Sequence, residues 1–143
     1  MAVFTADDLK QAVYGSFDGM ASVVGVIAGA LAVGAASGAH VLGPAVGLAV
    51  ASTLSMGSGR YLQDEKGKRS LHRALMMGVF TLLGSSLPAI PFLTGAGAAQ
   101  VIAGAVIVVL GAALIGRVRG YRITFILLTV SAGAAAGLSA VVA

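Results

Sequence analysis

The stretch Tyr14–Leu31, YGSFDGMASVVGVIAGAL, is an apolar run that contains one acidic residue, Asp18. The other acidic residues of the chain lie outside its apolar runs, at Asp7, Asp8, Asp64 and Glu65. A charged side chain at the centre of a bilayer costs about 2.5 to 3.5 kcal/mol on insertion scales, so it usually faces a partner, a cavity or a transport path. Asp18 is therefore the first candidate functional residue.

The composition is that of a membrane protein. Of the 143 residues, 58% are hydrophobic and only 10% are charged, whereas about a quarter of a soluble domain is charged. The length predicts a single transmembrane domain over residues 1–143. The absence of cysteine excludes disulfides, thiolate metal sites and thiol catalysis. The basic residues form short clusters between apolar runs, which indicates contact with lipid headgroups and no nucleic-acid partner.

The hydropathy pattern predicts an all-α membrane protein with five transmembrane helices. They are expected at about residues 11–34, 41–62, 74–93, 98–116 and 123–142, each close to the length that a bilayer core requires. A short polar loop at 63–73 joins the second helix to the third. Thr5 followed by Asp8 predicts the start of a helix. Pro44 is expected in the first turn of the second helix, and Pro88 and Pro91 are expected to kink or end the third.

The charge distribution predicts the orientation. All nine Lys and Arg residues lie before the first span, at the connection between the second and third spans, with Arg60 in the last turn of the second, or between the fourth and fifth spans. The positive-inside rule then places the amino end in the cytoplasm and the carboxyl end outside. No cleavable signal peptide is evident. Together with the short chain, this favours a bacterial cytoplasmic (inner) membrane.

Small residues predict close helix packing. The second span has a stripe at every fourth position: Gly43, Gly47, Ala51, Ser55 and Gly59. Such stripes let helix backbones approach closely within a membrane. They serve either packing within one chain or the seam of a dimer. Because five short helices enclose little space, we expect a homodimer with a shared path.

Two sets of residues at four-residue spacing share a helix face: Tyr14, Asp18 and Ser22 in the first span, and Ser52, Met56 and Arg60 in the second. If the two faces meet, a carboxylate, a thioether and several hydroxyls converge inside the membrane. That donor set suits Fe²⁺ better than Mg²⁺ or Ca²⁺, which prefer oxygen ligands alone. The carboxylate would also exchange a proton for the ion. The alternatives are an ion pair between Asp18 and Arg60, or a hydrogen bond to a helix end, and simple packing for Met56.

Other candidates for chemistry are weak. His40 and His72 have no second ligand at metal-binding spacing, so we expect both to be solvated. Met20, Met76 and Met77 are expected to pack. No catalytic motif is visible, so the sequence predicts neither an enzyme nor a bound cofactor.

Three segments together resemble the vacuolar iron transporter family. YGSFDGMASVVGVIAGA resembles the family's first-span signature, LSMGSGRYL (Leu54–Leu62) resembles its second-span signature SMGxGEYL, and GVFTLLGSSLPAIPFL (Gly78–Leu93) resembles its third span. The resemblance implies a homodimer that moves Fe²⁺, and sometimes Mn²⁺, out of the cytoplasm in exchange for protons. It also implies that Asp18 and Met56 contact the metal, on a path at the dimer interface.

The chain departs from that family's pattern in three places. The glutamate-rich insertion between the second and third spans is replaced by a loop of about a dozen residues. Leu48 stands near a position that is usually acidic, and Arg60 replaces the acid of the second-span signature. We therefore expect a short divalent-metal exporter, with Tyr14, Ser22, Ser52 and Arg60 as path-lining residues. Two alternatives stay open: a scaffold of the same fold that does not transport, and a transporter of another solute in which Arg60 contacts an anion.

Overall fold

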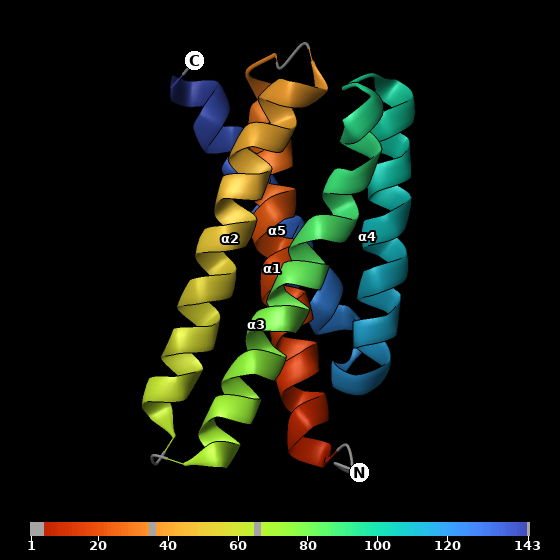
Figure 1. The fold of residues 1–143 in the computed structure, drawn as a ribbon. Helices are drawn as coiled ribbons and strands as arrows, with labels where there is room; N and C mark the ends of the chain where they lie inside the picture. Colours follow the sequence, from red (N-terminus) through yellow and green to blue (C-terminus); the bar gives the residue numbers. More distant parts are fainter. Residues whose placement is uncertain (1–4, 35–36, 65–66, 143) are drawn as a thin grey trace.

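The computed structural model describes residues 5–34, 37–64 and 67–142. Over these residues the chain forms five long helices and one short 3₁₀ helix (Figure 1). They are α1 (Ala6–Ala32), α2 (Gly38–Gln63), α3 (Lys68–Ala89), η1 (Ile90–Thr94), α4 (Ala98–Arg119) and α5 (Tyr121–Val142). Each of the five α-helices is long and apolar enough to cross a membrane. The prediction of an all-α chain with five helices that are able to span a membrane is confirmed.

The start of α1 is fixed by a capping box. The backbone N–H of Thr5 donates to Asp8 Oδ2 at 2.8 Å, and the backbone N–H of Asp8 donates to Thr5 Oγ1 at 3.2 Å. These two bonds satisfy donors that the first turn of a helix otherwise leaves free. The predicted helix start is confirmed.

Several helices extend further than the hydropathy pattern indicates. α2 begins at Gly38, so Pro44 is its seventh residue and the prediction of a first-turn proline is wrong. α3 begins at Lys68, inside the predicted polar loop, and α4 continues to Arg119, so that only Gly120 separates it from α5. Backbone hydrogen bonding continues into the polar residues that flank an apolar run, whereas hydropathy marks only the apolar part. Gly120 has φ +100, a left-handed conformation that favours glycine.

The predicted effect of the two prolines in the third span is confirmed. α3 ends at Ala89, directly after Pro88, and the chain continues as η1 with Pro91 near its start. A proline has no backbone N–H and its ring crowds the preceding turn, so an α-helix does not continue through such a pair. The change to 3₁₀ geometry turns the chain toward α4.

α1 is the central element of the bundle (Figure 1) and packs against all four of the other α-helices. One buried cluster joins it to α2, α3 and η1, and a second joins it to α4 and α5. The first contains Val23, Ile27, Val41, Ala45, Ala49, Ala89 and Phe92; the second contains Val13, Met20, Ala112, Ile115 and Leu128. Met20 therefore packs as predicted.

The basic segments gather at one end of the bundle. The start of α1, the α2–α3 connection and the α4–α5 connection lie together at the bottom of Figure 1, and the α1–α2 and η1–α4 connections lie at the top. We call the first of these the basic end and the other the far end. The connections that carry Lys and Arg therefore lie at one end of the bundle and those without them at the other, as the sequence predicted.

The small-residue stripe of α2 faces away from the rest of the chain. A Cβ atom added at Gly43, Gly47 or Gly59 would have no atom of the described structure within 4 Å. By contrast, a Cβ at Gly29 of α1 would lie 2.7 Å from Ser139 Oγ of α5. Of the two uses considered for the stripe, packing within one chain is thus not the one that these α2 glycines serve.

Candidate functional site

Asp18 lies inside the α1 span, and its direction is set by two neighbouring glycines. A Cβ at Gly15 would lie 2.5 Å from the backbone oxygen of Met77, and a Cβ at Gly19 would overlap the backbone oxygen of Thr81. α1 and α3 are therefore in backbone contact on this side. Asp18 falls on an adjacent side of α1 and is half-buried. The packing of Gly15 and Gly19 against α3 thus fixes how α1 is rotated about its axis, and with it the side of α1 from which Asp18 projects.

The Asp18 carboxylate has no partner within the part of the chain that the structure describes. Among residues 5–34, 37–64 and 67–142, none forms a hydrogen bond or an ion pair with it. Arg60, the partner considered from the sequence, instead contacts Asp64, with 3.0 Å between Nη2 and Oδ1. The alternative of an Asp18–Arg60 pair is therefore wrong for this chain. A carboxylate in an apolar helix without a structural partner is available to bind a cation or a proton.

An open hollow extends from the Asp18 face toward the far end. It has a volume of about 810 Å³ and lies between α1, α2 and α5. Its α1 wall begins with Ser22, one turn beyond Asp18, and continues through Gly25 and Gly29. Its polar side chains are those of Ser22, His40 and Ser139. We call this space the outer hollow.

The other predicted path residues do not line the outer hollow. Tyr14 is 48% exposed and lines a separate pocket between α1, α4 and α5, of about 230 Å³. Ser52 and Met56 are partly buried on α2. In the described part of the chain no hydrogen bond or ion pair joins them or Arg60 to Asp18, and no group of three or more His, Asp or Glu residues has the arrangement of a metal site. The predicted donor set of a carboxylate, a thioether and hydroxyls therefore stays a prediction.

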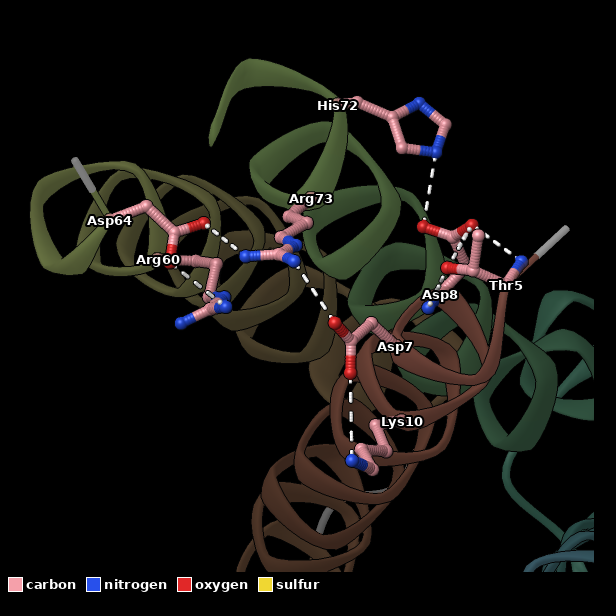
Figure 2. Close-up of polar contacts among 8 residues, drawn as sticks. All are labelled: Thr5, Asp7, Asp8, Lys10, Arg60, Asp64, His72 and Arg73. Atoms are coloured by element: carbon pink, nitrogen blue, oxygen red, sulfur yellow. Dashed lines mark hydrogen bonds and ion pairs between the residues drawn. The ribbon is translucent and has the colours of Figure 1, made fainter. Parts of the chain in front are cut away.

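A group of charged residues joins three helices at the basic end (Figure 2). Arg73 of α3 contacts Asp7 of α1 at 2.9 Å and Asp64, the residue that caps α2, at 3.4 Å. Arg60 contacts the other oxygen of Asp64, and Lys10 contacts Asp7 at 3.5 Å. We call these five residues the ionic cluster. It holds the start of α1, the end of α2 and the start of α3 together.

The two histidines are not simply solvated. His72 Nε2 lies 3.1 Å from Oδ1 of the buried Asp8, although the His72 side chain is 53% exposed (Figure 2). His40 is exposed and its Nδ1 lies 3.2 Å from Ser37 Oγ. His72 is therefore exposed to solvent as expected, but it also joins α3 to α1 through Asp8. Its partner is distant in sequence, so residue spacing gave no signal of the contact.

Gln11, a buried polar residue on nearly the same face of α1 as Asp18, was not singled out from the sequence. Gln11 of α1 is only 8% exposed, and its Oε1 atom has no hydrogen-bond partner among the described residues. Gln11 and Asp18 are seven residues apart, so they lie on nearly the same face of the helix. The spacing was visible in the sequence, but Gln11 lies at the very edge of the first apolar run.

Comparisons of the chain with known protein families, with curated proteins and with solved structures find no match. A function is therefore inferred from the residues and geometry described above and from the motif resemblance.

Proposed function

We propose that the protein exports a divalent transition metal, Fe²⁺ or Mn²⁺, from the cytoplasm in exchange for protons. The observation that supports this most directly is Asp18, a carboxylate within a membrane-spanning helix that has no partner among the described residues. The cost of placing such a group in a bilayer is rarely met unless it takes part in transport or binding. In this proposal the basic end faces the cytoplasm, following the positive-inside rule.

The α1 face gives the ion a route. A cation bound at Asp18 would leave past Ser22 into the outer hollow, which is open and reaches the far end of the bundle. Binding needs the ionised carboxylate, and a proton arriving from the outer hollow would neutralise Asp18 and release the ion. One carboxylate thus couples the two fluxes, because it holds either the metal or the proton.

The preference for a transition metal rests on Met56. A thioether is a soft ligand that Mg²⁺ and Ca²⁺ avoid and that Fe²⁺ tolerates. Met56 belongs to LSMGSGRYL, the segment that resembles the second span of the vacuolar iron transporters. The same resemblance supports the choice of Fe²⁺ or Mn²⁺ as substrate.

A homodimer would complete the site. Asp18 is only half-buried, and the glycines at 43 and 47 face away from the chain with open space beside them. A second copy packed there would cover apolar surface, and we propose that it also brings a second Asp18 close to the first. Two carboxylates neutralise one divalent ion, so we propose that the path lies between the two copies.

The proposal is tested by metal uptake into proteoliposomes under an imposed pH gradient. Wild type is compared with Asp18→Asn, which keeps the side-chain size but removes the charge, and with Asp18→Glu, which keeps the charge. We expect gradient-dependent Fe²⁺ and Mn²⁺ flux in wild type, background flux in Asp18→Asn and partial flux in Asp18→Glu. Full flux in Asp18→Asn would show that the carboxylate does not couple the metal to the proton.

Flux of the wild type alone separates the alternatives. If folded protein moves no metal, a scaffold role gains support. Competition by anions would indicate transport of another solute, although Arg60 is paired with Asp64 in this structure and is not a free anion contact.

A further inference from the structure

An apolar groove lies between α1, α3 and α4. Its volume is about 390 Å³, within the range of small-molecule sites in proteins. Fifteen residues line it and only one of them, Ser16, has a polar side chain. The groove is separate from the outer hollow and shares no lining residue with it.

The groove exists because α4 touches its neighbours at few points. Toward the far end a Cβ at Gly104 would lie 3.3 Å from the backbone oxygen of Pro88, so α4 approaches the end of α3 closely there. Further along, Met20 reaches across from α1, since its Cε would lie 2.8 Å from a Cβ at Gly111. From the top of Figure 1 toward the basic end, α3 slants away from α4. The space between them remains lined by apolar side chains.

The groove runs along the helices for about the thickness of one leaflet of a bilayer. Along α4 its lining runs from Ile107 to Val118, near the basic end. Eleven helical steps correspond to roughly 16 Å, about half of the roughly 30 Å hydrocarbon thickness of a bilayer. An acyl chain of the leaflet at the basic end would therefore fit along it.

The mouth of the groove at the basic end is positively charged. Arg117 directly precedes the lining residue Val118. Lys10 directly follows the lining residue Leu9, but its Nζ contacts Asp7 Oδ1 at 3.5 Å, so the positive charge at the mouth comes mainly from Arg117. Both basic residues are exposed, and among the described residues Arg117 forms no ion pair. The far end of the bundle has no Lys or Arg. An apolar groove with a cationic mouth matches an anionic amphiphile in charge and in polarity.

We propose that this groove binds one acyl chain of an anionic phospholipid, whose phosphate contacts Arg117. The site does not depend on metal transport, so it stands or fails separately from the proposed function. The lipid would act as an additional packing element, since it fills the space between α4 and the α1–α3 pair.

The test uses the absence of tryptophan from the chain. Phe80 lines the groove, so Phe80→Trp places a single fluorophore there; Phe125→Trp places one on α5, outside it. Both proteins are reconstituted in phosphatidylcholine vesicles with a minor fraction of brominated phosphatidylglycerol or brominated phosphatidylcholine. We expect brominated phosphatidylglycerol to quench the Phe80→Trp reporter at least twice as strongly as brominated phosphatidylcholine. The Phe125→Trp reporter should respond equally to both.

Two second-site changes identify the parts of the site. In the Phe80→Trp protein, Arg117→Gln should remove the preference for phosphatidylglycerol, whereas Arg122→Gln at the same end should keep it. For the groove itself, Leu114→Phe should lower quenching by phosphatidylglycerol, and Leu110→Phe should not, because Leu110 is similarly exposed but does not line the groove. Circular dichroism checks that each variant folds.

Three outcomes would overturn the proposal. Equal quenching of Phe80→Trp by both lipids would mean that the groove holds only bulk lipid. An unchanged preference in Arg117→Gln would remove the headgroup contact. Protection from both lipids that grows with protein concentration would show that a second copy of the chain fills the groove.

Discussion

Replacing Gly15 by alanine should force α1 and α3 apart. The new Cβ would lie 2.5 Å from the backbone oxygen of Met77 and 3.0 Å from the backbone nitrogen and the hydroxyl oxygen of Thr81. Ordinary van der Waals contact of a Cβ begins at about 3.4 Å. Two of these three neighbours are backbone atoms, so a side-chain rotation cannot remove the overlap. One of the two helices must move as a unit.

The magnitude follows from two opposing contributions. Overfilling a packed interior typically costs about 1 to 3 kcal/mol. Alanine in place of glycine within a helix contributes about 0.8 to 1.0 kcal/mol in the opposite direction. Gly47→Ala isolates the second contribution, because no atom lies within 4 Å of the added Cβ in the described chain. The two variants should therefore differ by about 1 to 3 kcal/mol in the free energy of unfolding, with Gly15→Ala the less stable.

The comparison is made in one detergent, with unfolding by a denaturing detergent followed by circular dichroism. In monomeric protein, Gly15→Ala should unfold at a denaturant fraction no higher than that of wild type, and Gly47→Ala at a fraction no lower than that of wild type. Because Gly15 also orients Asp18, Gly15→Ala should lower metal flux even in samples that remain folded. The packing argument is refuted if Gly47→Ala loses as much stability as Gly15→Ala in monomeric protein.

Two further predictions concern the basic end. Thr5→Ala removes the capping box of α1 and should cost about 1 kcal/mol of stability, measured in the same unfolding assay, while Thr5→Ser should cost little. Arg73→Gln removes the link between Asp7 and Asp64 and should cost roughly 0.5 to 1 kcal/mol at low salt; the loss should shrink in 1 M salt, where such contacts are screened, and a salt-independent loss would point to packing instead.

The number of helices and the isolation of Asp18 were predictable from the sequence because each depends on a local property. Twenty apolar residues span a bilayer wherever they occur, and an acidic residue within such a run is visible without any structure. The two glycines beside Asp18 were visible too, but their use against α3 was not. Which neighbouring helix they face depends on how the helices are arranged, and hydropathy does not predict that arrangement.

The contacts at the basic end divide by sequence separation. Arg73 and Asp7 are 66 residues apart, and only the folded bundle brings them together. Arg60 and Asp64 stand at i,i+4, the spacing of a helical ion pair. This pair was predictable, but the second helix was expected to end at residue 62 with the polar loop beyond it, so Asp64 was not considered as a helical neighbour of Arg60.

Met56 is the least predictable member of the candidate site. The sequence places it on a shared face with Ser52 and Arg60, and the structure keeps it partly buried on α2. Whether that face meets Asp18 depends on how the helices are arranged around one another. Residue spacing within one helix does not determine that arrangement.

An odd number of crossings leaves the chain on the side opposite to the one where it entered: α1 starts at the basic end and α5 finishes at the far end (Figure 1). Two copies in the same orientation therefore cannot be fused head to tail by a short flexible tether, since the tether would have to cross the lipid itself. A linker that contains its own spanning helix would be needed. Antiparallel copies could be joined by a few residues. A functional tandem fusion with one linker type and not the other would reveal how the subunits are arranged.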